Sequence, residues 1–204
     1  MTESTPYNPC SKKGGIRASI ATKLMDEVKA GSIRALIARA ADFYGPYAEK
    51  VGIPNALIFN RVADGKKPNL LAKDSTKHSY TFTLDIASAL GKLARSDKAF
   101  GQVWHLPTAP DPLTGKDFVA LAAKEFGARP GYLVLSKWML IAAGMFDRTV
   151  YEIAEMYYQN EFDYVFDSTK IQDAFGISPT PYSDGVGKTA EYYRKSRRQE
   201  KTKK

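Results

Sequence analysis

The segment Ile33-Arg34-Ala35-Leu36-Ile37-Ala38, followed shortly by Asp42-Phe43-Tyr44-Gly45-Pro46, decides the expected fold. The first six residues are almost wholly apolar, which is typical of a short strand buried on both faces of a parallel sheet. We expect residues 42–46 to form the loop that leaves the carboxyl end of this strand. Open α/β sheets bind their ligands at that end. Any functional site should therefore lie near this loop.

An amphipathic helix is expected directly before the strand. Apolar residues recur every four positions up to a glycine, at Ile16, Ile20, Leu24, Val28 and Gly31. A pattern with this period, closed by glycine, favours a helix with one buried face. A helix followed by a buried strand is half of a βαβ unit, so the chain belongs to the α/β class.

Helices and strands alternate along the rest of the chain. We expect further strands at 79–83 and 102–106, and helices at 55–63, from Asp85, at 136–145, at 148–161, at 167–176 and from Ser183 or Asp184. Thr114 is a suitable N-cap for a helix that runs to Phe126 and is closed by Gly127.

Composition points to an ordinary globular protein. The 204 residues are 44% hydrophobic and 25% charged, enough for one substantial core. No apolar stretch approaches the roughly 20 residues that span a bilayer, and residues 1–13 lack the apolar core of a secretory signal. A cytoplasmic location is expected.

The single cysteine, Cys10, and two histidines, His78 and His105, offer neither a disulfide nor a recognised metal spacing.

The net charge of +8 is concentrated at one end. Residues 194–204 hold seven basic residues and one acidic residue, a net of +6, which leaves +2 for residues 1–193. Terminal runs of like charge are commonly disordered. We therefore expect a globular domain over 1–193 followed by a solvated, disordered tail over 194–204, an interpretation that we favour over a nucleic-acid-binding arm.

The chain has no evident phosphate-binding or dinucleotide-binding loop. Gly185-Val186-Gly187-Lys188-Thr189 is similar to the end of a phosphate-binding loop, but Tyr182 stands where that motif needs a further glycine. No G-x-G-x-x-G occurs either. We do not expect this chain alone to hold a dinucleotide.

Four segments, taken in order, resemble the extended short-chain dehydrogenase/reductase family, the NAD-dependent epimerases and dehydratases that act mainly on nucleotide sugars. Arg39–Pro46 is similar to that family's R-P-x-N-V-Y-G-P and Tyr80–Ala87 to its F-V-x-V-x-D-V-A. Gly101–Leu106 resembles the strand before the C-terminal lobe, and Asp167–Lys170 with 175–180 resembles D-x-S-K…L-G-x-x-P.

The resemblance implies the C-terminal part of a Rossmann-type parallel sheet plus a mainly helical substrate-binding lobe. It also implies that the chain covers only the second half of a family member, and that the glycine-rich loop and the first strands lie in an absent first half. The implied cofactor is NAD or NADP. Uncovered sheet edges and apolar faces would be covered by the missing half or by a second copy in a homodimer.

The family's catalytic Tyr-x-x-x-Lys pair is replaced. Alignment of Asn8–Arg17 with the family's N-P-x-S-P-Y-G-x-S-K places Lys13 at the tyrosine and Arg17 at the lysine. In the family the tyrosine moves a proton at the carbinol oxygen while hydride moves at the nicotinamide, and the lysine binds the nicotinamide ribose. The resemblance thus assigns Lys13 and Arg17 to catalysis and Arg17, with Tyr44, to cofactor binding.

Substrate contacts are altered as well. Asp42 occupies the position of the asparagine that contacts the diphosphate in the family, and a carboxylate there would repel phosphate. His78 stands near the family's pyrophosphate-binding arginine. We therefore assign Asp42 and His78 to the binding of a small-molecule substrate, for which a sugar-like compound is one candidate.

Three functions remain open. The leading hypothesis is an NAD(P)-dependent epimerase/dehydratase-like oxidoreductase polypeptide that is inactive without its dinucleotide-binding half. The second is a non-catalytic ligand-binding or regulatory module on the same scaffold, since the tyrosine is absent. The third is nucleic-acid binding through Arg194–Lys204, which would fall steeply with salt concentration.

Overall fold

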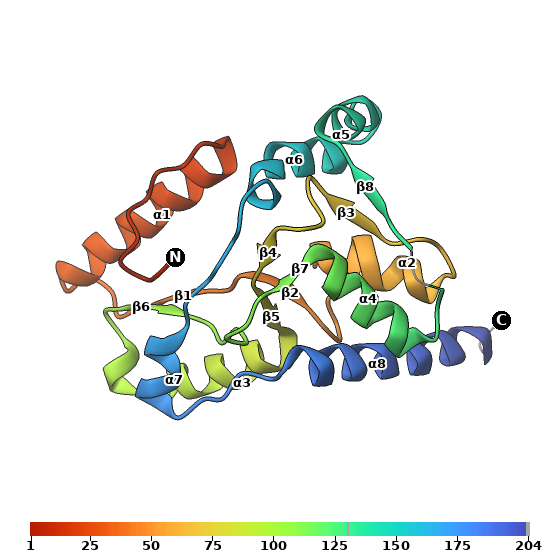
Figure 1. The fold of residues 1–204 in the computed structure, drawn as a ribbon. Coiled ribbons are helices and arrows are strands. Elements are labelled where there is room, and N and C mark those ends of the chain that lie inside the picture. Colours follow the sequence, from red (N-terminus) through yellow and green to blue (C-terminus); the bar gives the residue numbers. More distant parts are fainter. Residues whose placement is uncertain (130, 203–204) are drawn as a thin grey trace.

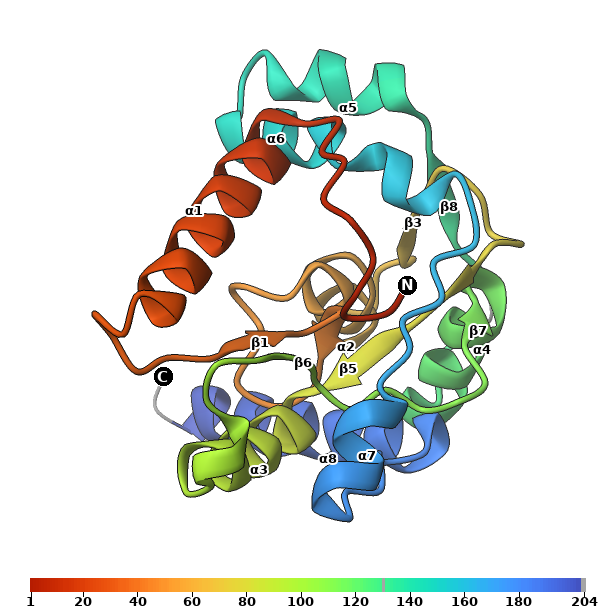
Figure 2. The same ribbon diagram turned by 90° about the vertical axis from the view of Figure 1, so that its left-hand side faces the viewer.

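The computed structural model of the protein describes residues 1–129 and 131–202. Short strands lie in the middle of the molecule (Figure 1). Helices α3 (Thr83–Ala94), α7 (Thr169–Phe175) and α8 (Tyr182–Thr202) lie on one side of them, and α5 (Lys137–Gly144) and α6 (Arg148–Glu155) lie on the opposite side (Figure 2). The structure is an α/β fold with mostly parallel strand pairs, which confirms the expected class.

Strands from distant parts of the chain pair with one another. Three parallel pairs join β1 (Ile37–Arg39) to β6 (Val103–His105), β2 (Asp42–Tyr44) to β5 (Tyr80–Phe82), and β3 (Asn69–Leu71) to β8 (Leu133–Leu135). One antiparallel pair joins β4 (Lys77–His78) to β7 (Leu113–Thr114). The β2–β5 pair places residues 42 and 80 side by side, which positions the site described below.

Two expectations for the first strand region were wrong. The strand expected at 33–38 begins only at Ile37, and it is half-buried rather than buried on both faces. Arg34 instead bonds to Asp97 and covers the Phe100 ring, 4.0 Å from its centroid. Residues 42–44, expected as a loop, form β2 because β5 supplies a parallel partner.

The helices agree closely with the sequence pattern. They are α1 (Lys12–Lys29), a π-helical turn (Asn55–Phe59) continuing into α2 (Asn60–Ala63), α3 (Thr83–Ala94), α4 (Gly115–Phe126), α5 (Lys137–Gly144), α6 (Arg148–Glu155), α7 (Thr169–Phe175) and α8 (Tyr182–Thr202). Short 3₁₀ turns lie at Asp97–Ala99 and Tyr157–Asn160. For α4, Thr114 Oγ1 accepts from the Asp117 amide and Gly127 takes the left-handed conformation, as expected.

The expected disordered tail is helical as far as it is described. Helix α8 continues to Thr202. Arg194 donates to the carbonyl of Glu125 over 2.8 Å, and Arg197 donates to Asp64 over 2.7 Å. These bonds hold the start of the basic segment against α4 and α2.

The main core is aromatic. Its largest members are Tyr44, Phe59, Tyr80, Phe118 and Tyr182, which come from β2, the π-helical turn, β5, α4 and α8. Two smaller clusters lie between α3, β6 and α7, and beneath the α5–α6 hairpin.

Helix α1 contributes nothing to these clusters. None of its residues is buried, and Ile16 and Ile20 are more than half exposed. The helix is therefore present as expected, but Ile16 and Ile20 on its apolar face are uncovered, whereas Leu24 and Val28 on the same face are half-buried.

Candidate functional site

A cavity of about 440 Å³ lies between α1, the start of β2 and the segment that follows α6. Its polar and charged lining residues are Lys13, Arg17, Asp42, Lys50, Gln159 and Tyr164, and apolar side chains such as Phe43, Ile53, Leu57, Ile153 and Met156 complete it. The structure thus brings together Lys13, Arg17 and Asp42, which the sequence placed in one site.

The start of α1 is anchored where it meets this cavity. Ser11 caps the helix, because its hydroxyl accepts from the Gly14 amide over 3.0 Å, and the same hydroxyl lies 3.7 Å from the sulfur of Met156. The Lys12 amide donates to the Glu155 carboxylate. Residues four apart share a helix face, so this anchor directs Lys13 and Arg17 toward the cavity together.

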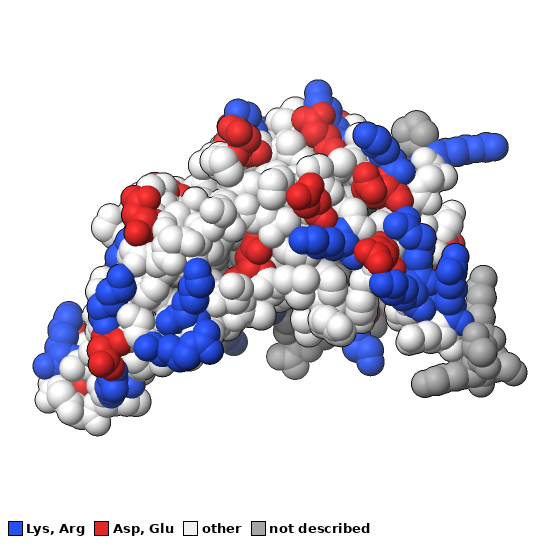
Figure 3. Space-filling view, turned by 90° about the horizontal axis from the view of Figure 1, so that it is seen from below, with Lys and Arg blue, Asp and Glu red and all other residues white. Residues whose placement is uncertain are grey.

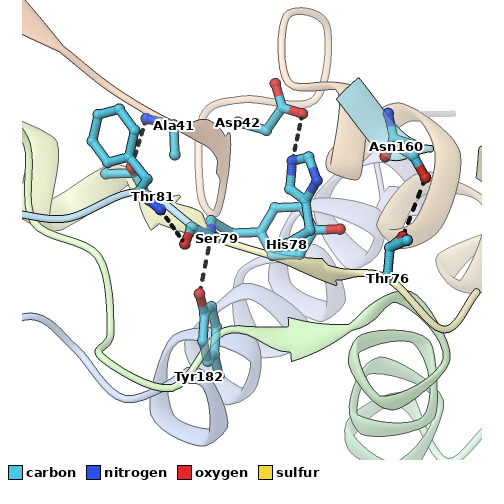
Figure 4. Close-up of polar contacts among 10 residues, drawn as sticks. Ala41, Asp42, Thr76, His78, Ser79, Thr81, Asn160 and Tyr182 are labelled. Atoms are coloured by element: carbon cyan, nitrogen blue, oxygen red, sulfur yellow. Dashed lines mark hydrogen bonds and ion pairs between the residues drawn. The ribbon is translucent and has the colours of Figure 1, made fainter. Parts of the chain in front are cut away.

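A buried histidine contacts the carboxylate of Asp42. His78 Nε2 lies 3.0 Å from Asp42 Oδ2 (Figure 4). The His78 side chain is only 4% exposed, whereas that of Asp42 is 27% exposed and reaches the cavity. His78 therefore supports the carboxylate but does not line the cavity itself.

Aromatic rings fix the histidine in turn. The His78 ring lies 4.6 Å from the Tyr164 ring at an interplanar angle of 19°, and 4.8 Å from the Tyr80 ring at 35°. Tyr80 belongs to β5, and the backbone of Tyr164 is held beside His78 by an isolated β-bridge, so the imidazole has little freedom to rotate away from Asp42.

Tyr164 is a site residue that the sequence did not reveal. It lines the cavity, and its backbone joins the sheet through bonds with Lys77 and Ser79. Burial, followed by the nearby Asp42 carboxylate, raises the pKa of Tyr164 far above its ordinary value. Its hydroxyl stays protonated at neutral pH, so it serves as a hydrogen-bond donor and not as a base.

Tyr44 does not reach the site. It is 1% exposed and packs within the aromatic core, with Phe118 at 5.2 Å and Phe82 at 5.5 Å between ring centroids. Its hydroxyl has no hydrogen-bond partner in the described part of the chain. The structure therefore separates Tyr44 from Lys13, Arg17 and Asp42, and its neighbour Phe43 lines the cavity in its place.

A second cavity, of about 500 Å³, lies against α8 and holds none of the residues predicted for the site. Lys50 and Val51 line both cavities. We take the cavity at Asp42 as the candidate site because the predicted residues converge there.

The lining of the candidate site combines three cationic side chains, from Lys13, Arg17 and Lys50, with one carboxylate, Asp42. The cations suit an anionic group or ribose hydroxyls, and the carboxylate suits a hydroxyl donor.

Across the described residues, His, Cys, Asp and Glu side chains form no group of three that could hold a metal ion. No helix in that part of the chain is long and apolar enough to cross a membrane.

The chain matches no family model. It is 25% identical over 198 residues to a dTDP-glucose 4,6-dehydratase of Mycolicibacterium smegmatis, a match that covers 95% of this chain and 53% of that protein.

Solved structures share the fold at lower identity. A dTDP-glucose 4,6-dehydratase from Bacillus anthracis in complex with NAD aligns with a TM-score of 0.74 at 18% identity, over 97% of this chain and 56% of that one. A UDP-glucose 4-epimerase from Thermotoga maritima with UDP-glucose aligns with a TM-score of 0.75 at 18% identity, over 96% and 57%.

These matches define the fold as the Rossmann type of the nucleotide-sugar epimerases and dehydratases. Sequence and structure neighbours point to the NAD-dependent epimerase/dehydratase family, as the motifs in the sequence implied. The chain spans about half the length of the relatives it matches, and corresponds roughly to their C-terminal half.

Proposed function

We propose that this polypeptide is the substrate-side part of an NAD(P)-dependent epimerase/dehydratase-like oxidoreductase, and that it turns over substrate only when a dinucleotide-binding half is supplied. The observation that carries the proposal is the convergence of Lys13, Arg17 and Asp42 on one cavity.

The donor set fits the ribose end of a nicotinamide dinucleotide. Arg17 carries several N–H donors and lies on the same helix face as Lys13. When bound, the nicotinamide would supply the acceptor or donor of hydride. The described residues include no glycine-rich turn that could bind the pyrophosphate, so the proposed site would bind only the ribose end of the cofactor.

In the proposed site, Lys13 takes the position of the proton donor and acceptor at the substrate carbinol. Arg17 holds ribose hydroxyls. Asp42, oriented by His78, accepts a hydrogen bond from a substrate hydroxyl, and Tyr164 donates one. The carboxylate disfavours a phosphate beside it, so we propose a sugar-like substrate whose hydroxyls, not a diphosphate, face Asp42.

The second candidate is a non-catalytic ligand-binding module. It is favoured by one specific feature, the replacement of the tyrosine by Lys13 and of the lysine by Arg17. Such a module would bind the same class of ligand without turnover.

The experiment is a fusion of the dinucleotide-binding half of the Mycolicibacterium smegmatis relative ahead of Met1. NAD+ binding is measured by calorimetry and hydride transfer by the absorbance of NADH, with dTDP-glucose and simple sugars as trial substrates. We expect turnover by the fusion and none by the chain alone.

Matched variants separate the two candidates. Lys13→Ala should abolish turnover with little change in NAD+ affinity, whereas Arg17→Ala should weaken NAD+ binding about tenfold. Lys12→Ala, an exposed neighbour on the same turn, is the control and should change neither. A fusion that binds NAD+ and substrate but never transfers hydride would contradict the oxidoreductase proposal and support the binding module.

A further inference from the structure

The second cavity, of about 500 Å³, lies between α8 and the loop that follows β2. Its lining comes from the loop at 47–51, from α2 and its C-cap, and from α8. Of the described residues, it shares Lys50 and Val51 with the candidate site at Asp42. Small-molecule sites commonly have a volume of about 300–1,000 Å³, so this cavity has the size of a ligand site.

Hydrogen bonds between buried side chains hold the walls of this cavity together. Asn55, which is fully buried, donates to the Gly45 carbonyl over 2.8 Å and accepts from the Gly45 amide over 3.1 Å. The Tyr193 hydroxyl accepts from Asn55 over 3.2 Å and donates to Asn60 over 2.7 Å. Asn60 donates in turn to the Glu49 carbonyl over 3.0 Å. These bonds tie the loop to α2 and α8, so the cavity is preformed, as ligand sites usually are.

Tyr47 has an unfavourable backbone conformation at the rim of the cavity. Its φ is 66°, in the left-handed region that residues with a Cβ rarely adopt. The side chain is 77% exposed, and its ring lies 4.9 Å from the Tyr192 ring at an interplanar angle of 63°. Backbone strain of this kind is concentrated at functional sites. The strained loop thus presents an aromatic ring to the cavity and not to the core.

The charges of the lining disfavour a ligand of a single sign. Glu49 and Asp64 supply two carboxylates, and Lys50 and Arg197 supply two cations. Arg197 donates to Asp64 over 2.7 Å, so this pair is largely neutralised. Glu49 and Lys50 then contribute one charge of each sign. An anion would be repelled by Glu49 and a cation by Lys50.

Two groups of the lining suit a carboxylate. In the part of the chain that the structure describes, neither the Lys50 ammonium nor the Ser196 hydroxyl has a hydrogen-bond partner. Both can donate, and an ionised carboxylate only accepts hydrogen bonds. A carboxylate between them would gain a charge-assisted bond from Lys50.

Other groups of the lining suit an ammonium group. Glu49 is anionic, and the face of the Tyr47 ring attracts cations through its partial negative charge. A hydrogen bond from the Tyr192 hydroxyl to the Glu49 carboxylate raises the pKa of Tyr192 to about 12, so this hydroxyl remains a donor at neutral pH and orients the carboxylate. A carboxylate can accept several hydrogen bonds, which lets Glu49 bind a ligand ammonium as well.

We propose that the second cavity is a further ligand site, which binds a free amino acid as its zwitterion. The carboxylate of the ligand bonds to Lys50 and Ser196. Its ammonium lies between Glu49 and the face of the Tyr47 ring. Its side chain contacts Val51, which is 71% exposed, and the volume leaves room for a side chain as large as that of phenylalanine. The proposal is independent of the function proposed above.

The test is an NMR titration of the isotopically labelled full chain with L-phenylalanine. We expect a dissociation constant of about 0.1–1 mM, with shifts in the amides of 47–51 and 193–197. N-acetyl-L-phenylalanine lacks the ammonium, and L-phenylalaninamide lacks the carboxylate. Each should bind at least about tenfold more weakly, because one charge of the lining then has no partner.

Charge-removing variants test the orientation of the ligand. Glu49→Gln should weaken the binding of L-phenylalanine about tenfold without weakening that of N-acetyl-L-phenylalanine. Lys50→Gln should have a similar effect on L-phenylalanine without weakening the binding of L-phenylalaninamide. A merely structural effect would instead weaken the binding of all three compounds alike.

Tyr47→Gly separates the ring from the fold. Glycine adopts a positive φ without strain, so the variant should remain folded, as circular dichroism would show. Its affinity for L-phenylalanine should fall about tenfold, since the ring no longer faces the ammonium. Phe162→Ala, which removes another aromatic ring that is 73% exposed, is the control and should leave the affinity unchanged.

Four outcomes would overturn the proposal. They are no shifts up to about 10 mM L-phenylalanine, shifts confined to residues around Asp42, an analogue that binds as tightly as L-phenylalanine, and equal losses for all three compounds in both charge-removing variants. Saturation by methyl glucoside without saturation by L-phenylalanine would give the cavity to a neutral polyol.

Discussion

His78 Nε2 lies 3.0 Å from Asp42 Oδ2, although the two residues are 36 positions apart in the chain. The parallel pairing of β2 with β5 brings them together, and the stacked rings of Tyr80 and Tyr164 hold the imidazole in place. The contact with His78 fixes the orientation of the Asp42 carboxylate, which can accept a hydrogen bond at the wall of the cavity.

His78→Ala should lower the free energy of unfolding by about 2–4 kcal/mol, because the substitution removes a buried stacked ring and the donor to Asp42. Lys77→Ala, at the exposed neighbouring position, is the control and should change it by less than about 0.5 kcal/mol. Urea denaturation followed by circular dichroism measures both. A loss below about 1 kcal/mol for His78→Ala would show that the pair is not part of the packed structure.

Asp42→Asn should strengthen the binding of nucleotide diphosphates at the cavity by about tenfold, since it removes a negative charge while keeping an oxygen acceptor for His78. Calorimetric titration with UDP-glucose measures the change. Asp64→Asn, at the second cavity, serves as the control for a general change in charge. Equal affinities of the wild type and Asp42→Asn would contradict the role given to this carboxylate.

Tyr44→Phe should leave stability unchanged or raise it by about 1 kcal/mol, because the buried hydroxyl has no partner in the described chain. Gly185→Ala should destabilise the protein by about 1–3 kcal/mol, since its Cβ would clash with that hydroxyl. The double variant should recover part of the loss, and denaturation curves of all three test the coupling. Strictly additive effects would argue against the contact, and a large loss in Tyr44→Phe would indicate that the hydroxyl is used.

His105 should make the protein less stable in mild acid. It is buried against Phe166 at a centroid distance of 3.8 Å, and its Nδ1 lies 2.7 Å from the Asp167 carbonyl, to which it donates. Burial lowers the pKa of His105 below its ordinary value. The unfolded chain therefore binds the proton more readily, so the contribution is complete above about pH 6.5 and is lost as pH falls through the folded pKa.

His105→Asn keeps a donor for the Asp167 carbonyl but does not titrate. We expect the difference in unfolding free energy between wild type and this variant to shrink steadily from pH 7 to pH 5. A difference that stays constant over this range would contradict the assignment.

Much of the fold could be predicted because its signals are local. The caps at Thr114 and Gly127 fixed α4 to within a residue, and Gly176 marked the end of α7. The strands near residues 33–44 were misplaced because pairing with β5 and β6 depends on residues far along the chain.

The site residues, too, could be predicted where the signal was local and not where it depended on distant parts of the chain. Lys13, Arg17 and Asp42 could be placed together because family motifs gave their order and spacing. Tyr164 could not, because it reaches the cavity through a bridge to His78, 86 positions away, that no local pattern encodes. Tyr44 lies in a motif beside Asp42, but sequence position alone does not show that its ring turns into the core.

Basic residues on one face of the molecule take part in contacts within the fold. Lys and Arg side chains on the face formed by α3, α7 and α8 are interspersed with Asp and Glu (Figure 3). Several of the lysines there bond to backbone carbonyls, as Lys98 does to Ala174 and Lys170 does to Val103. These contacts give the basic residues of this face a role in holding α7.

The central claim is tested most directly by calorimetric titration of the folded chain with NAD+ and NADP+. We expect no measurable binding, because Arg17 would hold only one end of a dinucleotide and the described residues include no glycine-rich turn that could receive the pyrophosphate. Micromolar binding of either dinucleotide would contradict the account, since the chain would then hold the whole cofactor without the half that we propose it requires.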